Sequence, residues 1–155
     1  MRVKNNNNVC EISFLAVSEN EAFARMAAAA FVMPLNPTVE ELADIKTAIS
    51  EAVTNAILHG YNQDGRGMVH MRCEREKEQL SFCISDTGVG IDNVEQAMEP
   101  LYTSKPELER SGMGFSFMEA FMDSLLVESS PGNGCKVSME KYICPLLDEE
   151  PSKDN

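Results

Sequence analysis

The chain has 155 residues, of which 43% are hydrophobic and 25% are charged, and its formal net charge is −12. This length fits one domain, which buries roughly 70% of the surface of its unfolded chain and so forms its own core. The acidity argues against nonspecific binding of nucleic acid, whose affinity rests on Lys and Arg neutralising phosphates. The charge is compatible either with a basic partner surface or with solubility alone.

No apolar run approaches the roughly 18 residues of a membrane span. Residues 1–8 are basic and Asn-rich and lack the apolar stretch of a signal peptide. The five cysteines are odd in number and show no CxxC spacing. These features predict a cytoplasmic protein with reduced thiols and no membrane segment. The histidines do not stand at ligand spacing from the cysteines, which argues against a Cys/His metal site.

The first predicted elements are a strand and a helix. Residues 9–16 are mostly apolar and predict the strand. Ser18 offers a helix N-cap, and Glu21 stands three residues later, where it would complete a capping box. The Ala-rich stretch that follows favours a helix as far as Phe31.

A second helix is predicted beyond Pro34 and Pro37, which break the first helix. Thr38 and Glu41 have the spacing of another capping box. Apolar residues then recur at spacings of three and four, which indicates a helix with one buried face. We expect this helix to end near Gly60.

The middle of the chain predicts a β-hairpin followed by a lid. Apolar and polar residues alternate over 69–74 and again over 80–84, as they do in strands with one buried face. Residues 92–111 have no regular period and contain two prolines and many charges. Such a long irregular segment is more typical of a functional lid than of a passive connection.

The last part predicts a helix over 112–121 that opens on glycines, and strands over 124–127 and 136–142. Because strands come in adjacent pairs, we expect an α+β fold, a two-layer sandwich. Its sheet would be mixed and mostly antiparallel, with the helices on one face. The domain is predicted to span 1–145, and 146–155 to form a flexible acidic tail.

Glu51, Asn55 and His59 stand four residues apart in the second predicted helix and so share one face. An amide oxygen can ligate Mg²⁺, which prefers oxygen ligands. A carboxylate can take the proton from an attacking hydroxyl. A solvated polar face would give the same pattern, so this helix alone leaves both interpretations open.

Asp86 follows a predicted strand and begins the turn Asp-Thr-Gly-Val-Gly, whose glycines are Gly88 and Gly90. Glycines let the backbone approach a flat ligand. A carboxylate can accept a hydrogen bond from an adenine amino group. Asp and Gly are also common in turns that merely end a strand, so this motif too is ambiguous by itself.

Gly112 and Gly114 open the third predicted helix. Backbone N–H groups at a helix N-terminus attract phosphate oxygens. The motif is not a Walker A loop, which needs Gly-Lys-Ser/Thr, and it is not a dinucleotide GxGxxG because residue 117 is Phe117.

The three motifs together, in this order, suit a Mg-nucleotide. They resemble the Bergerat-type ATP-binding fold shared by gyrase, Hsp90, histidine kinases and MutL, the GHKL superfamily. The resemblance is closer still to the small bacterial anti-sigma factor serine kinases and covers nearly the whole chain. Residues 49–56, Ile-Ser-Glu-Ala-Val-Thr-Asn-Ala, are similar to the N-box of those kinases, and residues 100–115 to their lid and second glycine box.

The resemblance implies roles at both ends of an ATP molecule. Glu51 would be the general base and Asn55 would ligate Mg²⁺. Asp86 would bind adenine, and Gly88 and Gly90 would shape the wall beside it.

The resemblance also implies that the lid and the second glycine box hold the phosphates. These contacts would come from Thr103, Ser104, Lys105, Gly112 and Gly114. Arg110 would reach the γ-phosphate, where its planar fork suits phosphate oxygens and can stabilise transferred charge. For Lys105 and Arg110 the alternative is ordinary solvated charge.

One position departs from the family. The family usually has Gly-Thr where this chain has Gly134 and Cys135. A thiol is a weaker hydrogen-bond donor than a hydroxyl. A contact from this position to the adenine side is therefore in doubt, and we expect nucleotide affinity to be lower.

The family also implies partners. Such a kinase binds a sporulation sigma factor when loaded with MgATP and phosphorylates a serine of an anti-anti-sigma protein. Glu21 and Arg25 match partner-contacting positions, although their spacing equally fits a plain helical ion pair. The family forms homodimers, for which the apolar surface of residues 9–31 offers an interface. A module that binds nucleotide and sigma factor without catalysis is the alternative.

Overall fold

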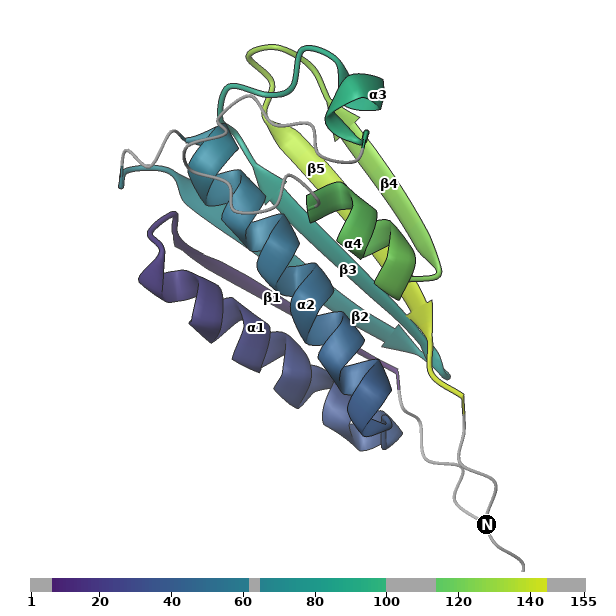
Figure 1. Cartoon of the computed structure of the whole chain (residues 1–155). Helices are drawn as coiled ribbons and strands as arrows, with labels where there is room; N and C mark the ends of the chain where they lie inside the picture. The colour runs from purple at the N-terminus through teal and green to yellow at the C-terminus, as the bar shows by residue number, and fades with distance from the viewer. Residues whose placement is uncertain (1–6, 62–64, 100–113, 145–155) are drawn as a thin grey trace, which may run out of the picture.

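The fold is that of a computed structural model of the chain, in which residues 7–61, 65–99 and 114–144 are described. It has two layers, a five-stranded sheet and a layer of helices on one of its faces (Figure 1). The strands are β1 (Asn8–Leu15), β2 (Met68–Glu76), β3 (Gln79–Asp86), β4 (Ser124–Ser129) and β5 (Cys135–Tyr142). The helices are α1 (Glu19–Val32), α2 (Val39–Asn55), α3 (Val94–Ala97) and α4 (Gly114–Phe121), with a 3₁₀ turn at Met33–Leu35 and a π-helical turn at Ala56–Gly60.

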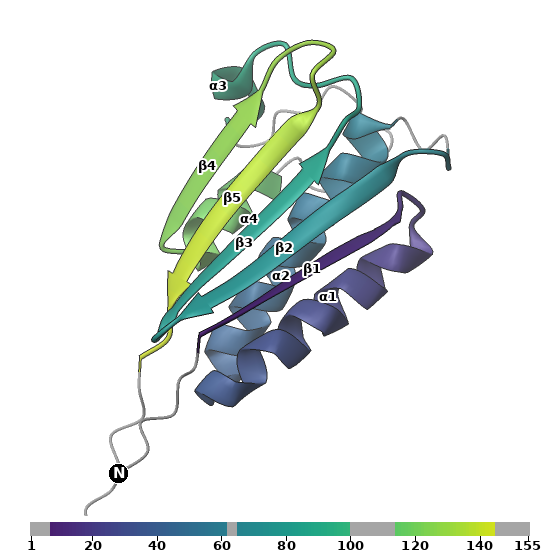
Figure 2. The same cartoon turned by 180° about the vertical axis from the view of Figure 1, so that it is seen from behind.

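The strands lie in the order β1-β2-β3-β5-β4, and each neighbouring pair is antiparallel. Both predicted hairpins, β2-β3 and β4-β5, are present, and the second hairpin joins the sheet through β5. The helices α1, α2 and α4 cover one face, and the view from behind shows the other face bare (Figure 2). The predicted α+β sandwich is confirmed, with a sheet that is antiparallel at every described pairing.

The core lies between the sheet and α2. In β2 and β3 every second residue is buried, which matches the alternation of the sequence and places one face of each strand against the helices. From α2, Ile45, Ile49 and Val53 are fully buried against these strands. The removal of this apolar surface from water is the main driving force for the two-layer arrangement.

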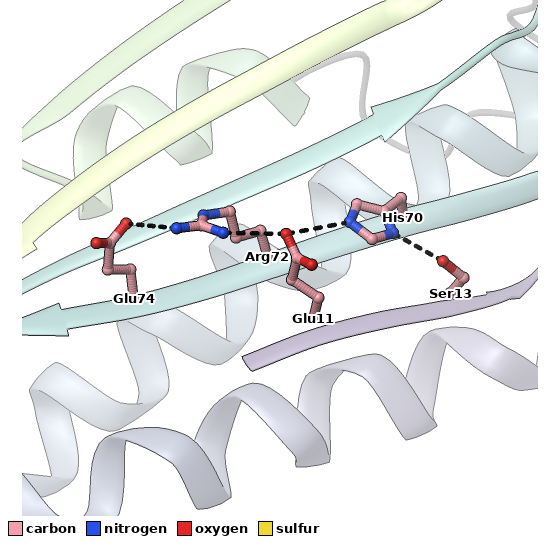
Figure 3. Close-up of polar contacts among 5 residues, drawn as sticks. All are labelled: Glu11, Ser13, His70, Arg72 and Glu74. Carbon is pink, nitrogen blue, oxygen red and sulfur yellow. Dashed lines mark hydrogen bonds and ion pairs between the residues drawn. The ribbon is translucent and has the colours of Figure 1, made fainter. Parts of the chain in front are cut away.

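The bare face of the sheet carries a row of polar side chains (Figure 3). Arg72 donates hydrogen bonds to Glu11 at 3.0 Å and to Glu74 at 3.4 Å. His70 lies 3.8 Å from Glu11 and forms a 2.7 Å hydrogen bond with Ser13. The hydrogen bond from Arg72 lowers the pKa of Glu11. These ion pairs are exposed, so they favour the strand register more than they contribute to stability.

The two predicted capping boxes have different outcomes. At α2 the box is confirmed, because Glu41 N–H donates to Thr38 Oγ1 at 3.0 Å and Thr38 N–H to Glu41 Oε1 at 2.9 Å. At α1 it is wrong, because Ser18 has a helical backbone and its side chain makes no cap hydrogen bond. The Glu21 side chain is instead bonded to Arg25 and Ser50. The Glu21 carboxylate, which the capping box required, is thus engaged in a tertiary contact between α1 and α2.

The helix predicted to end near Gly60 does so, but its last turn is π-helical. The N–H of Ala56 bonds both Ala52 O and Val53 O, at the point where the helix widens. Such turns occur often at functional sites. Among the described residues, no helix has the length and apolar character needed to cross a membrane.

The caps give a test of the fold. We expect Thr38→Ala to lower the free energy of unfolding by about 1 kcal/mol. The Glu41 N–H loses its acceptor, Thr38 Oγ1, and the reciprocal hydrogen bond from Thr38 N–H to Glu41 becomes less well ordered. This loss of stability corresponds to a fall in Tm of roughly 2–4 °C for a domain of this size. Ser18→Ala is the matched control and should change stability little, since its hydroxyl caps nothing. Equal losses in the two variants, measured by urea unfolding, would contradict this account.

Candidate functional site

The first and third sequence motifs meet in space. Glu51 and Asn55 lie on the α2 side that faces the first residue of α4, and both side chains are half-buried. A Cβ added to Gly114 would lie 3.2 Å from Glu51 Oε2 and 3.1 Å from Asn55 Nδ2. The start of α4 therefore touches both side chains, and only a residue without a side chain leaves them undisplaced.

The second motif meets the end of the same helix. Val89 N–H donates to Gly60 O at 2.9 Å, so the turn after β3 is bonded to the π-helical turn. A Cβ on Gly88 would lie 1.9 Å from Gly60 O, a distance no side chain tolerates. A Cβ on Gly60 would lie 2.9 Å from Asp86 Oδ1. Glycines at both positions thus permit backbone contact beside the Asp86 carboxylate.

The turn after β3 is also held by the β4–β5 turn. Gly132 N–H donates to Val89 O at 2.7 Å, and Gly134 N–H to Gly88 O at 3.1 Å. Gly90 has a φ of +76°, in the left-handed region that favours glycine. The loop of Asp86 is therefore fastened on both sides, once to the extension of α2 and once to the second hairpin.

The Asp86 carboxylate accepts a hydrogen bond from Gly88 N–H at 2.9 Å and one from the backbone of Cys135. Burial raises the pKa of Asp86, and these two hydrogen bonds offset part of that rise. When ionised, this carboxylate is an acceptor whose direction is set by two backbone donors. Such an acceptor can accept a hydrogen bond from an amino group on a flat ring.

Cys135, the position that departs from the family, pairs with Asp86 across β3 and β5. Burial, helped by the charge of Asp86, raises the pKa of the Cys135 thiol to about 11. The thiol therefore stays protonated at neutral pH and offers only a weak donor. The Cys135 backbone, which binds Asp86, does not depend on the side chain that the family varies.

Glu21 and Arg25 form the predicted ion pair at 3.2 Å on α1. Arg25 also lies 3.4 Å from Ser50 Oγ on α2, and Ser50 donates to Glu21. The three side chains link α1 to α2, and Ser50 is the neighbour of Glu51. The partner role of Glu21 and Arg25 stays a prediction.

The structure brings Glu51 and Asn55 together with Gly114 at the start of α4. It brings Asp86 and Gly88 together with Gly60, in the π-helical turn that follows α2. The catalytic and binding roles given to these residues stay predictions. The remaining predicted site residues, Thr103, Ser104, Lys105, Arg110 and Gly112, lie outside the described residues.

Sequence reasoning missed the parts of the site that act through backbone contact. The sequence indicates Gly60 as the residue after His59 at the end of a helix, but not as a residue that packs against the Asp86 carboxylate. Tyr61 was not singled out, although its hydroxyl binds the backbone of Thr87 at 2.8 Å. The only signal in the sequence for Gly60 and Tyr61 is that they directly follow His59.

The residues present fit a magnesium ion carried by a nucleotide. No cluster of three or more His, Cys, Asp or Glu side chains suited to a metal ion occurs in the described part of the chain. The Asn55 amide, beside the Glu51 carboxylate and the start of α4, supplies one oxygen of the type Mg²⁺ prefers. Mg²⁺ is commonly held by few protein oxygens and by substrate phosphates, which is what this arrangement allows.

The profile of the histidine kinase-like ATPase domain matches residues 15–141. The chain therefore belongs to that family, a GHKL-type ATPase fold.

Curated relatives indicate the group within this family to which the chain belongs. The anti-sigma F factor of Clostridium beijerinckii is 58% identical over 134 residues, which cover 86% of this chain and 94% of that protein. The anti-sigma F factor of Clostridium acetobutylicum is 55% identical over 141 residues, covering 91% of this chain and 98% of that protein. The chain is thus a member of the anti-sigma F factor group.

Solved structures share the fold at low sequence identity. The RsbU and RsbW domains of Rv1364c from Mycobacterium tuberculosis align with a TM-score of 0.63 at 16% identity, over 90% of this chain and 34% of that one. The catalytic domain of histidine kinase ThkA aligns with a TM-score of 0.54 at 15% identity, over 88% of this chain and 96% of that one.

The half-buried Asp86 predicts a pH dependence. Because its pKa is raised on folding, the native state holds this proton more tightly than the unfolded chain does. The ionised group therefore costs stability above its native pKa. That cost is relieved as the pH falls through the native pKa towards the unfolded value. We expect the free energy of unfolding of the wild type minus that of Asp86→Asn to rise as the pH is lowered.

Urea unfolding of both proteins in the absence of nucleotide, at a series of pH values from neutral to acidic, measures this difference. A difference that stays constant, or that falls with decreasing pH, would show that burial does not dominate the environment of Asp86.

Proposed function

We propose that this protein is an ATP-dependent anti-sigma factor and a serine kinase. With MgATP bound, it would bind and inhibit a sporulation sigma factor of the sigma F type. It would also transfer the γ-phosphate to a serine of its anti-anti-sigma antagonist. The observation that carries this proposal is the meeting of Glu51, Asn55 and the N-terminus of α4. The names of the curated relatives support the sigma factor partner.

The phosphate end of the nucleotide would lie at the start of α4. Free N–H groups and the positive end of the helix dipole favour phosphate there. Asn55 would hold Mg²⁺ through its amide oxygen. Mg²⁺ held there would supply positive charge that offsets the negative charge of the phosphates. In the lid, Thr103, Ser104 and Lys105 would contact the phosphates.

Glu51 would act on the serine of the antagonist. Its carboxylate would accept the proton from the serine hydroxyl as the serine oxygen bonds to the γ-phosphorus. The bond from that phosphorus to the bridging oxygen breaks, and ADP leaves with the electron pair. Arg110 would neutralise charge on the transferred group. Because Glu51 lies one helical turn from Asn55, the base and the cation ligand move as one rigid unit.

The adenine end would lie at Asp86. The carboxylate, aimed by Gly88 and Cys135 N–H groups, would accept the hydrogen bond from the adenine amino group. Gly88 and Gly90 would shape the wall beside the ring, because a Cβ at these positions would clash with Gly60 O and Ser130 O. In this proposal, both ends of the nucleotide would lie against one stretch of the chain, from Glu51 to Gly60.

A homodimer would use β1 and α1. Phe14 is buried in the core, but Leu15, Phe23 and Met26 are 39%, 59% and 58% exposed. Met68, opposite Leu15 on β2, is 49% exposed as well. Exposed apolar area of this kind is typical of an interface, and a second copy of the chain is the occupant we propose. Both partners and the dimer would act in the cytoplasm.

The alternative is a binding module that uses ATP as a structural ligand and transfers no phosphate. Incubation with radiolabelled ATP and a purified anti-anti-sigma protein separates the two. Label on a serine of that protein supports the kinase, and binding of sigma factor without any transfer supports the module.

Glu51→Gln tests the catalytic role. The change keeps the shape and an acceptor oxygen but removes the base, whose contribution is typically about 100-fold or more. We expect phosphorylation of the anti-anti-sigma protein to fall by about that factor, while the Kd for MgATP changes by less than about threefold. Glu119→Gln, the same charge change at an exposed position of α4, is the control and should keep full activity. Undiminished phosphorylation by the Glu51 variant would remove this residue from its role.

Arg25→Ala tests the partner surface. If Arg25 binds the sigma factor, affinity for it should fall about tenfold or more. Stability should change by less than about 0.5 kcal/mol, because the lost contacts are a helical ion pair and a long 3.4 Å hydrogen bond to Ser50. Ser50→Ala removes the link to Glu21 and leaves the Arg25 charge, so it should bind the sigma factor nearly as well as the wild type. Equal loss of binding in both variants, measured by calorimetry, would point to helix packing instead.

A further inference from the structure

Tyr61 is a buried residue on which three segments meet. Its hydroxyl donates to Met68 O at 2.7 Å, where β2 begins. It accepts the N–H of Thr87 at 2.8 Å and lies 3.2 Å from Thr87 Oγ1. A Cβ on Gly67 would lie 2.3 Å from the ring of Tyr61, so the ring packs directly on that backbone. With 9% exposure, the side chain has little access to water that could replace these bonds.

The residue that Tyr61 binds stands between the two parts of the adenine motif. Thr87 follows Asp86 and precedes Gly88, whose N–H donates to Asp86 Oδ1 at 2.9 Å. A shift of the Thr87 peptide would therefore move both the carboxylate and the donor that aims it. Gly60, the neighbour of Tyr61, braces the carboxylate from the other side.

Tyr61 also connects the two ends of the site. It directly follows the π-helical turn Ala56–Gly60, which continues α2 beyond Asn55. The chain from Asn55 to Tyr61 is thus a continuous helical extension whose end is bonded to the turn of Asp86. The turn of Asp86 is bonded to this extension by the Tyr61 hydroxyl and by the Val89–Gly60 hydrogen bond.

We propose that Tyr61 is a positioning residue that aligns the Asp86 carboxylate with the exocyclic amino group of adenine and so determines selectivity for the base. This inference rests on the proposed binding of MgATP. A site built to hydrogen-bond a ligand amino group discriminates strongly against an analogue that lacks it. That discrimination depends on direction, because hydrogen bonds weaken steeply when bent. Loss of the Tyr61 hydroxyl would leave Asp86 and its backbone donors present, but would release the Thr87 peptide that lies between Asp86 and Gly88.

Tyr61→Phe removes the hydroxyl and keeps the ring that packs on Gly67. Calorimetry gives the Kd for MgATP and for magnesium purine riboside triphosphate, which is ATP without the 6-amino group. We expect the wild type to prefer ATP by about tenfold or more, and the variant to lose about fivefold of that preference. A general weakening of the fold would reduce both affinities alike and leave the ratio unchanged. Tyr142→Phe, which removes an exposed hydroxyl on β5, is the matched control and should keep the wild-type ratio.

Two further variants keep the inference testable. In an Asp86→Asn background, Tyr61→Phe should have no additional effect on the ratio, because the group it aims is gone. Thr87→Val removes only the 3.2 Å contact with the Tyr61 hydroxyl and should lower the ratio by about twofold. This change serves if the Phe variant fails to fold.

An unchanged ratio in a folded Tyr61→Phe protein, or in Thr87→Val if the Phe variant is unfolded, would overturn the positioning role while MgATP binding stands. Absence of MgATP binding by the wild type would overturn the proposed function, and this inference with it.

Discussion

The packing of the apolar face of α2 on the sheet is the constraint on which the rest of this protein depends. Ile45, Ile49 and Val53 are fully buried there, and they fix the rotation of the helix about its axis. Once that rotation is set, Glu51 and Asn55 must lie along the side that faces α4. The positions of Glu51 and Asn55 are thus a consequence of core packing, and no further contact is needed to turn this side of the helix towards α4.

The end of α2 organises the other half of the site through backbone contacts. The turn of Asp86 is bonded to Gly60 and to the β4–β5 turn, so three segments distant in sequence share one small volume. Such close approach requires glycine, and Gly88 has no room for a Cβ. The gain is an Asp86 carboxylate held by backbone donors. The cost is partial burial of its charge, which raises its pKa. An acceptor of this kind is already oriented in the folded protein, so it needs no reorganisation when a ligand binds.

This arrangement explains how the departure at Cys135 is tolerated. The backbone of Cys135 contributes to the Asp86 site whatever its side chain is, because the register of β3 and β5 places it there. The thiol, kept protonated by burial, adds little polar character. The hydrogen bond from this position to Asp86 therefore does not require the threonine that the family usually has there.

Local sequence determined most of the elements and their faces, but not the short helix α3, which lies in the segment predicted to be irregular. The alternation over 69–74 and 80–84, the spacing of apolar residues in α2 and the Thr38–Glu41 box depend on neighbours in the chain, and each is present in the structure. The grouping of Glu51 with Asn55 also follows from helical spacing alone. The three motifs, taken in order, indicated the fold of the family to which the chain belongs.

Tertiary structure decided what depends on residues far apart in sequence. The Ser18 box is absent because Ser50, from another helix, binds the carboxylate it needed. The place of β5 between β3 and β4, the contact of Gly114 with Glu51 and Asn55, and the hold of Tyr61 on Thr87 have no local signature. Spacing along a chain reports only which face a residue occupies, whereas the partner across a contact is chosen by the packing of the whole core.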